Sequence, residues 1–338
     1  MNYVRAGNTV GAVFFLLSGD DVLTGSRFDD YFAGGPGQDL LKGLEGNDIL
    51  IGNGGDDVLD GGEGVDTAVL SGSPLSAVTI SKNGDEWQVT DRSGAYGSER
   101  LIGIERIEFA DRVLDLTLSA PTVEAATGRI LRSPIYDVAL MTANGLMTEA
   151  EAIVALVKAA DATTSVATLA YQFFTGSIPT EAGVDYLVSP TGPNTNNLNS
   201  AYYQNFNLEN RYINFAVNLG KLGEGRTQFE AEYGSLSLAE ATRKAYGEIF
   251  GRSPTDEKLQ ALLSGGRDAY FESYGRDGPN GIGTKAAMVG WLLAEAEKAD
   301  VGQYAKANAA FLTDLADGAA FNIDLVGVYG RPEFDLVT

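Results

Sequence analysis

The sequence predicts a multidomain β + α protein: a parallel β-roll with a β-rich cap, followed by an all-α domain. Three observations carry this prediction. A nine-residue period of glycine and aspartate runs through residues 19–72, alternating apolar and polar residues fill 73–118, and Ala, Leu and Glu at helical spacing dominate from about residue 129. The 338 residues are enough for roughly two or three domains.

The nine-residue units share two fixed positions. Complete units begin at Gly25, Gly34, Gly43, Gly52 and Gly61, and a weaker copy begins at Leu16. The sixth position is always aspartate: Asp21, Asp30, Asp39, Asp48, Asp57 and Asp66. The eighth position is apolar: Leu23, Phe32, Leu41, Leu50, Leu59 and Ala68. Glycine permits tight loops with positive φ, so each unit predicts a loop followed by a short strand whose eighth residue points inward.

Two such units form one turn of a flattened coil, so loops 18 residues apart stack on one edge. Asp21, Asp39 and Asp57 then share one edge, and Asp30, Asp48 and Asp66 share the other. Stacked carboxylates repel unless a cation lies between them. Calcium takes 6–8 oxygen ligands at about 2.3–2.6 Å, which carboxylates and loop carbonyls supply. We therefore expect several calcium ions, held by these six aspartates, and folding coupled to metal binding.

The nonapeptide pattern resembles the calcium-binding repeat of RTX proteins. The resemblance implies a β-roll that is unfolded where calcium is scarce and folds outside the cell, where calcium is near millimolar, which suits export. A solvated acidic linker is the alternative interpretation, and it gives no reason for the strict register.

Residues 73–118 predict strands that cap the coil. The stretch AVTISKNGDEWQV reads as a hairpin with its turn at Asn83-Gly84, and alternation continues through Ile104, Ile107 and Phe109. The segments DTAVLSG and IERIEFADRVLDL, following the repeats, resemble the C-terminal domain of serralysin-type secreted metalloproteases. The terminal Asp335-Leu336-Val337 resembles a type I secretion signal.

Composition excludes several classes of function. The net charge of −22 argues against nucleic acid as a partner. Histidine is absent, which excludes Ser-His-Asp triads and the HExxH zinc motif, so we expect no zinc and no enzyme in this chain. Acidic pairs by type alone, Asp256/Glu257 and Glu230/Glu232, carry the alternative of a glycan hydrolase. The apolar run VGAVFFLL, within residues 1–18, predicts a lead-in strand and no membrane insertion.

The rest of the chain predicts a linker at 119–145, a helical domain at 146–320 and a tail at 321–338. Thr148/Glu151 and Ser237/Glu240 are spaced as capping boxes. A helix-ending glycine followed by Pro-Thr and an acidic turn recurs at an offset of 75 residues, which indicates a duplicated helical unit. We expect Trp291, Tyr246 and Phe311 to pack in the core.

The helical half contains an unusual uncharged face. On a helix starting near Ser200, amide side chains share one side next to tyrosines: Tyr202, Tyr203, Asn207, Asn210, Arg211, Asn214 and Asn218. Amides offer donors and acceptors and tyrosines offer flat rings, a mixture that sugars need. A network of amides that ties helices together is the alternative. The loop at 275–283 has two readings as well: a further calcium site through Asp277, or a polar turn.

Residues 145–320, most densely at 171–219, resemble the N-terminal domain of the Caulobacter-type S-layer protein. The resemblance implies calcium-dependent anchoring to lipopolysaccharide O-antigen on a Gram-negative cell, with S-layer protein as a further partner. Together with the repeats it resembles the non-catalytic, C-terminal part of an S-layer-associated serralysin-type metalloprotease. The alternative function is a self-assembling, S-layer-like structural protein.

Overall fold

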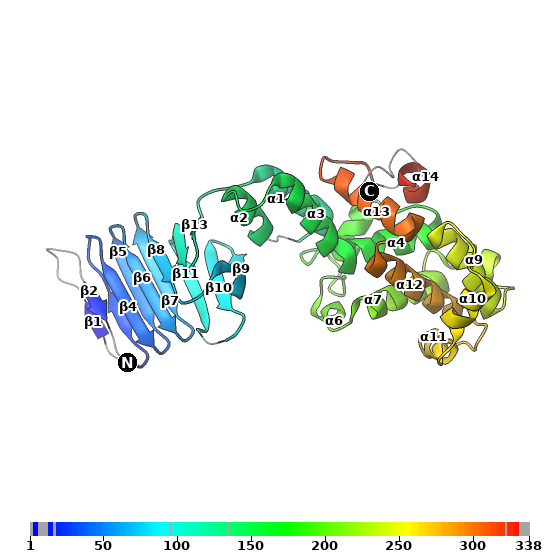
Figure 1. The fold of residues 1–338 in the computed structure, drawn as a ribbon, viewed down its shortest axis with the longest axis horizontal. Helices are drawn as coiled ribbons and strands as arrows, with labels where there is room; N and C mark the ends of the chain where they lie inside the picture. Colours follow the sequence, from blue (N-terminus) through cyan, green and yellow to red (C-terminus); the bar gives the residue numbers. More distant parts are fainter. Residues whose placement is uncertain are drawn as a thin grey trace. The chain divides into compact units, whose positions relative to one another are not determined.

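The computed structural model describes residues 3–5, 13–15, 18–94, 96–133, 136–321 and 323–330. The chain divides into two compact units, which are described separately: residues 1–124 with 135–152, and residues 125–134 with 153–338. The first is built mainly of strands and the second of helices, as Figure 1 shows. The predicted fold class, a β-roll with a strand-rich cap followed by an all-α domain, is confirmed.

Short parallel strands form the roll. They are β1 (Tyr3–Arg5), β2 (Val13–Phe15), β3 (Val22–Thr24), β4 (Tyr31–Pro36), β5 (Leu40–Glu45), β6 (Ile49–Gly54), β7 (Val58–Glu63) and β8 (Thr67–Leu70). Odd-numbered strands build one sheet and even-numbered strands the other. Paired residues such as Leu41 and Leu59 are 18 apart in the chain, so two nonapeptides make one turn of the roll.

The eighth residue of each repeat forms the core of the roll. Leu23, Leu41 and Leu59 are paired in one column and are fully buried. Phe32, Leu50 and Ala68 form the equivalent column in the other sheet and are also fully buried. Burying one such leucine or phenylalanine stabilises the fold by about 1.5–3 kcal/mol. These columns provide the apolar core that the very short strands need.

The cap continues both sheets. Its elements are η1 (Leu75–Ala77), β9 (Val78–Asn83), β10 (Glu86–Asp91), β11 (Ser98–Ile102), β12 (Arg106–Phe109) and β13 (Val113–Asp115). Strand β11 adds to β7 in parallel and places Leu101 beside Leu59, while β12 adds to β8 and places Ile107 beside Ala68. The hairpin turn lies at Gly84 and Asp85, one residue later than predicted, because Asn83 still pairs with Glu86.

The segment 119–145, predicted as a linker, contains two helices, α1 (Pro121–Leu131) and α2 (Tyr136–Ala143). Leu140 is buried in the core of the first unit. Asn144, just after α2, accepts a hydrogen bond from the Asp115 backbone N–H at 2.8 Å and donates to the Asp115 carbonyl oxygen at 3.0 Å. This region is therefore packed and hydrogen-bonded against the cap.

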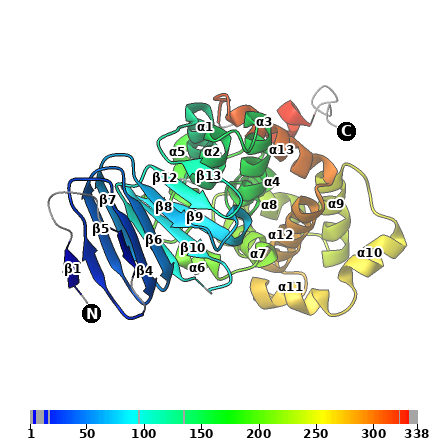
Figure 2. The same cartoon turned by 60° about the vertical axis from the view of Figure 1, so that its left-hand side comes forward.

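The second unit surrounds one central helix. Its elements, with α1 and α3 shared between the units by sequence, are α3 (Glu149–Ala159), η2 (Ala160–Ala162), α4 (Thr164–Thr175), α5 (Glu181–Val188), α6 (Ala201–Gln204), α7 (Leu208–Val217), the π-turn η3 (Asn218–Leu222), α8 (Arg226–Tyr233), α9 (Leu238–Phe250), α10 (Asp256–Leu263), α11 (Arg267–Gly275), α12 (Ile282–Ala299), α13 (Gly302–Leu315) and α14 (Leu325–Tyr329). Helix α12 is buried on nearly every side, and Figure 2 shows α7, α9 and α13 around it. At Gly290 the backbone of α7 approaches so closely that a side chain would overlap it. Trp291, Tyr246 and Phe311 are buried, as predicted.

The predicted helix starts and stops are present. The Thr148 hydroxyl accepts from the Glu151 N–H at 3.2 Å, and the Glu151 carboxylate accepts from the Thr148 N–H at 2.8 Å. Ser237 heads α9 with the same reciprocal capping box. The motif repeated at an offset of 75 residues appears as α4–α5 and α9–α10, each first helix ending at a left-handed glycine and each second helix capped by threonine.

Two ionisable side chains are buried along α12. The Lys285 ammonium donates to the carbonyl oxygens of Tyr233 and Gly234 at 2.9 and 3.0 Å, at the end of α8. Glu297 is 7% exposed. Its burial raises the pKa of the carboxyl group, and the nearby Asp161 carboxylate raises that pKa further.

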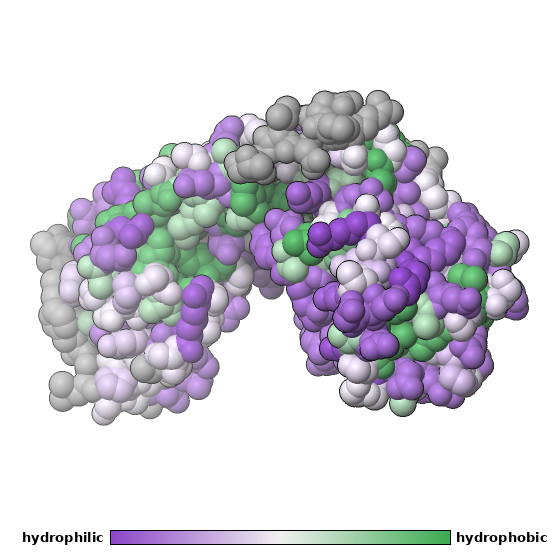
Figure 3. All heavy atoms as spheres, turned by 45° about the vertical axis from the view of Figure 1, so that its right-hand side comes forward, coloured by the Kyte–Doolittle hydropathy of each residue, from purple (hydrophilic) through white to green (hydrophobic). Residues whose placement is uncertain are grey.

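Among the described residues, no single helix has the length and apolar composition of a membrane span; one pair, Glu149–Ala162 with Thr164–Thr175, passes on those two criteria together but is bent by 63°. On the face drawn in Figure 3, hydrophilic residues cover most of the helical unit. The predicted secretion signal at Asp335-Leu336-Val337 lies outside the described residues.

Candidate metal centre and amide-lined pockets

The six repeat aspartates stand in two rows, and each of them is at most 3% exposed. One carboxylate oxygen of each accepts a hydrogen bond from the aspartate one turn earlier. The Asp21 N–H donates to Asp39 at 2.8 Å and the Asp39 N–H donates to Asp57 at 2.8 Å. In the other row the N–H groups of Asp30 and Asp48 donate to Asp48 and Asp66, each at 2.7 Å. Backbone bonds thus fix the first oxygen and aim the second into the loops.

That second oxygen, Oδ2, has no hydrogen-bond donor at Asp39, Asp48, Asp57 or Asp66, although it is buried. Desolvation by burial raises the pKa of Asp48 to about 7 and that of Asp57 to about 6, and neighbouring aspartates contribute to the same shift. A buried carboxylate oxygen without a donor is costly. A divalent cation at this position would satisfy these oxygens and keep the carboxylates ionised.

The first glycine of each repeat leaves space beside these oxygens. A Cβ atom built on Gly25 would overlap both the Asp30 Oδ2 and the Gly43 carbonyl oxygen. A Cβ on Gly43 would likewise overlap the Asp48 Oδ2 and lie 2.5 Å from the Gly61 carbonyl oxygen. Each space is therefore lined by one carboxylate oxygen and a carbonyl oxygen of the next turn. The donor set is all oxygen, which fits calcium.

The described residues contain no group of three or more acidic side chains converging as a ligand set. The spaces in the roll differ from such a group, because each takes a carboxylate from its own repeat and carbonyls from the loops. The aspartates, the glycines and the loop carbonyls would together hold the ions.

Two acidic residues of the cap extend the rows, and the sequence analysis did not identify them. Glu105 accepts the Asp66 N–H at 2.8 Å, as an aspartate of a further repeat would. Glu99 is 4% exposed and lies next to Asp57. The nine-residue period gives no signal for either, because the hairpin formed by β9 and β10 interrupts it.

Two adjoining pockets lie in the helical unit and share Asn214 and Asn218. The neutral pocket, about 520 Å³, is lined by Leu187, Asn194, Asn196, Leu198, Tyr202, Tyr203, Asn214, Phe215, Asn218 and Leu219. The basic pocket, about 580 Å³, is lined by Phe206, Asn214, Val217, Asn218, Lys221, Leu222, Tyr270, Ser273, Tyr274, Gly275 and Arg276. The volumes lie in the range of small-ligand sites.

Four of the predicted glycan residues line the neutral pocket: Tyr202, Tyr203, Asn214 and Asn218. The Tyr202 and Tyr203 rings meet edge to face at 5.3 Å. Tyr202 is 56% exposed, so its ring is available to a ligand. The helix expected from Ser200 is broken between α6 and α7, which turns the tyrosines of the first piece toward the amides of the second.

The other three predicted residues line neither pocket and hold the fold together. Asn207 caps α7 by accepting the Asn210 N–H at 2.8 Å. The Asn210 side-chain oxygen accepts from the hydroxyls of Tyr270 at 3.1 Å and Tyr274 at 2.9 Å. Arg211 donates to the carbonyl oxygens of Phe206 and Ala162, at 3.1 and 2.9 Å. For these residues the structure shows the internal network that was the alternative interpretation.

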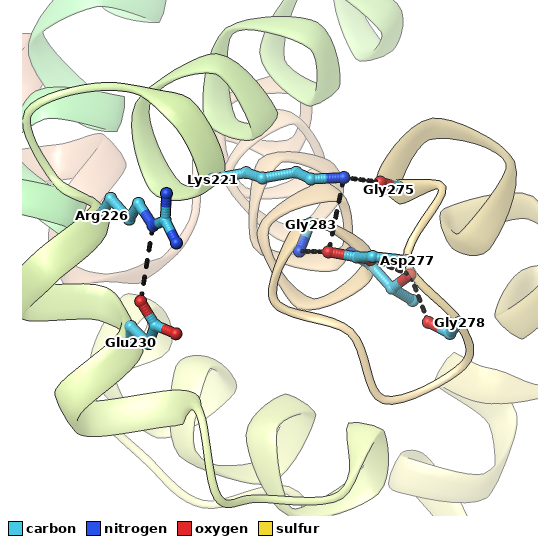
Figure 4. A network of polar contacts seen from close by, with 8 residues as sticks. Lys221, Arg226, Glu230, Gly275, Asp277, Gly278 and Gly283 are labelled. Atoms are coloured by element: carbon cyan, nitrogen blue, oxygen red, sulfur yellow. Dashed lines mark hydrogen bonds and ion pairs between the residues drawn. The ribbon is translucent and has the colours of Figure 1, made fainter.

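The loop containing Asp277 forms a polar turn (Figure 4). The Asp277 carboxylate accepts the Gly283 N–H at 2.7 Å and the Thr284 N–H at 3.2 Å, at the start of α12. Lys221 lies 3.5 Å from the same carboxylate. These donors take the oxygens that a calcium ion would need.

The acidic pairs considered for hydrolysis are bound to basic side chains. Glu230 lies 3.4 Å from Arg226 and Glu232 lies 2.9 Å from Lys244. Asp256 lies 2.6 Å from Arg243. Since each pair is engaged on the domain surface, none has the geometry of two carboxylates facing a substrate.

Comparison with known families identifies both halves of the chain. Residues 163–337, just over half of the chain, match the family model described as the RsaA N-terminal domain. The chain belongs to the RsaA N-terminal domain family. Residues 17–48 and 34–68 match the RTX calcium-binding nonapeptide repeat. Both pockets lie within the RsaA N-terminal domain, and all six repeat aspartates lie within the RTX matches.

Solved structures add a local likeness to the extracellular lipase LipA from Serratia marcescens. The identity is 26%, the TM-score is 0.26, and the alignment covers 28% of this chain and 15% of the lipase. No curated protein matches the chain. The sequence resemblances to RTX repeats and to an S-layer-type domain are thus confirmed.

Proposed function

We propose that the chain is a calcium-dependent module for cell-surface anchoring and secretion, in which the RsaA N-terminal domain binds lipopolysaccharide O-antigen. The observation that carries this proposal is the neutral pocket within the family domain. Its lining combines four asparagines, two tyrosines and aliphatic side chains, with no charged residue.

This lining suits a polysaccharide. Sugar hydroxyls donate and accept hydrogen bonds, which asparagine amides match in both directions. The apolar face of a sugar ring packs against an aromatic ring such as the exposed Tyr202. The adjoining basic pocket, with Lys221 and Arg276, extends the surface toward a substituent that carries negative charge. A long polymer that occupies both pockets would cross the shared side chains of Asn214 and Asn218.

The β-roll supplies the calcium dependence. Its buried aspartate oxygens lack donors in the absence of a cation, so low calcium disfavours the folded roll. Calcium at the roughly millimolar level found outside cells would fold it there. Export of an unfolded chain by type I secretion, followed by folding and attachment at the outer surface of a Gram-negative bacterium, fits this order of events.

A co-sedimentation experiment tests the proposal. The purified chain is mixed with lipopolysaccharide that carries O-antigen and with lipopolysaccharide that lacks it, each in millimolar calcium and in chelator. We expect the chain to sediment with the O-antigen form in calcium. Absence of binding by a folded chain would refute anchoring, and calcium-dependent sheets without lipopolysaccharide would support a self-assembling structural protein instead.

Pocket variants localise the contact. Tyr202→Ala and Asn214→Ala should each weaken O-antigen binding by about threefold to tenfold, the effect of one lost hydrogen bond or ring contact. Tyr186→Ala is the matched control, because Tyr186 is 51% exposed on α5 and lines neither pocket. Equal binding by all three variants would place the polysaccharide elsewhere on the domain.

We further propose that the chain is the non-catalytic part of a secreted serralysin-type zinc metalloprotease that acts at the S-layer. The basis is the likeness of the repeat-and-cap arrangement to that class, together with the surface-anchoring domain. Isolation of the native protein from the cell surface and its mass would test this, because a protease requires additional residues with a zinc motif.

A further inference from the structure

We propose that Glu99, in the cap, is a calcium ligand that closes the row formed by Asp21, Asp39 and Asp57. The inference rests on the calcium binding of the proposed function and extends it to a residue outside every repeat. Glu99 lies at the start of β11, beyond both matched RTX segments.

The register of the sheet places Glu99 where the next aspartate of the row would stand. Val58 pairs with Leu40, which puts Asp57 one turn after Asp39. Arg100 pairs with Val58 in the same parallel manner, which puts Glu99 one turn after Asp57. The backbone bonds match: the Val58 N–H donates to the Asp39 carbonyl at 2.8 Å, and the Arg100 N–H donates to the Asp57 carbonyl at 2.9 Å.

The Glu99 side chain points into the space used by the row. It is 4% exposed, and its Oε2 atom has no hydrogen-bond donor. A Cβ built on Gly52 would lie 2.6 Å from this oxygen and would overlap the Asp57 Oδ2, which also lacks a donor. Two buried carboxylate oxygens therefore face one small space, and they require either a shared proton or a cation between them.

The opposite row shows what normally occupies this position. There, the space beside Gly43 is lined by the Asp48 Oδ2 and by the carbonyl oxygen of Gly61 in the next turn. At Gly52 the Glu99 carboxylate oxygen takes the place of that carbonyl. A carboxylate is the stronger ligand for a hard divalent cation. The last site of this row would therefore be closed by two carboxylates from two different structural elements.

The experiment compares Glu99→Gln with Glu108→Gln in the full chain. Glu108 is an exposed glutamate of the cap strand β12 and serves as the matched control. Calcium ions bound per chain are counted by equilibrium dialysis, and the calcium midpoint of folding is followed by circular dichroism. We expect Glu99→Gln to bind one ion fewer and to need about threefold or more calcium to fold. The Glu108→Gln chain should match the wild type in both.

Each outcome has a distinct meaning. An unchanged ion count and midpoint for Glu99→Gln, with normal calcium binding by the wild type, overturns this inference and indicates a shared proton. A wild type that folds without calcium overturns the calcium role of the roll itself. If Glu99→Gln does not fold, Glu99→Asp retains the charge with a shorter reach. Folding of Glu99→Asp at raised calcium supports the inference, and failure of both variants at saturating calcium overturns it.

Discussion

Shortening the inward leucine Leu50 should raise the calcium concentration at which the roll folds. Leu50 lies in the middle of its column, paired with Phe32 and Ala68, and has no exposed surface. Its neighbour Ile49 lies on the same strand but points outward and is 37% exposed. The pair therefore separates loss of core packing from a change of residue on strand β6.

The magnitude follows from the burial. Truncation of a fully buried leucine to alanine costs about 3 kcal/mol, because the neighbouring strands close the cavity only in part. Calcium binding offsets this cost by mass action, at about 1.4 kcal/mol for each tenfold change. The midpoint should rise on the order of 100-fold if one ion is coupled to folding, and about threefold if roughly four ions are coupled. The size of the shift thus reports the number of coupled ions.

The assay is a calcium titration of the far-ultraviolet circular dichroism of Leu50→Ala, Ile49→Ala and the wild type. Ile49→Ala should change the free energy of folding by less than about 1 kcal/mol, as expected for an exposed strand position. Equal midpoints for the two variants would refute the inward assignment of the eighth repeat position. A destabilised Leu50→Ala chain that calcium does not rescue would refute the coupling of folding to calcium.

Three further predictions concern single positions. Gly55→Ala should abolish calcium-dependent folding, since Gly55 has φ of +133° and a Cβ there would overlap a carbonyl oxygen of the stacked loop, whereas Gly54→Ala, with open space around it, should fold as the wild type does; circular dichroism distinguishes them. Because burial raises the Glu297 pKa above its ordinary value of 4.5, folding takes up a proton above that pH, so the helical unit should lose stability as pH rises, and Glu297→Gln should flatten this slope in urea denaturation while the exposed Glu295→Gln should not. Ser237→Ala removes the capping box of α9 and should cost about 1 kcal/mol, seen as a lower melting temperature of the helical unit; an unchanged value would contradict the role of the cap.

The repeats could be predicted in detail because the fold converts sequence spacing directly into spatial neighbours. Once two nonapeptides make a turn, any residue lies beside the one 18 positions later, and the partners of Leu41 follow without further information. Glu99 was missed for the same reason. It follows Asp57 by a turn in space, but the hairpin of β9 and β10 lies between them in the chain.

The amide face was harder to predict because its partners come from distant segments. The spacing indicated that Asn210 and Asn214 lie on one side of a helix, and both do lie on α7. Their different roles depend on α11, where Tyr270 and Tyr274 take the Asn210 oxygen and leave Asn214 in the pockets. Arg211 could not be separated from the binding residues, since its carbonyl partner at Ala162 is 49 residues away.

The stacking of successive turns, each in contact with its immediate neighbours, makes the roll a one-dimensional assembly. In such a system, stability is a sum of intrinsic and nearest-neighbour contributions, and order spreads from an end that is already structured. The cap provides that end, because its hairpin registers itself through local pairs before any repeat is in place. Each turn laid on β11 and β12 then offers a finished edge to the next one. The roll should therefore grow from the cap toward the N-terminus, and loss of the cap should cost far more than loss of the first repeat.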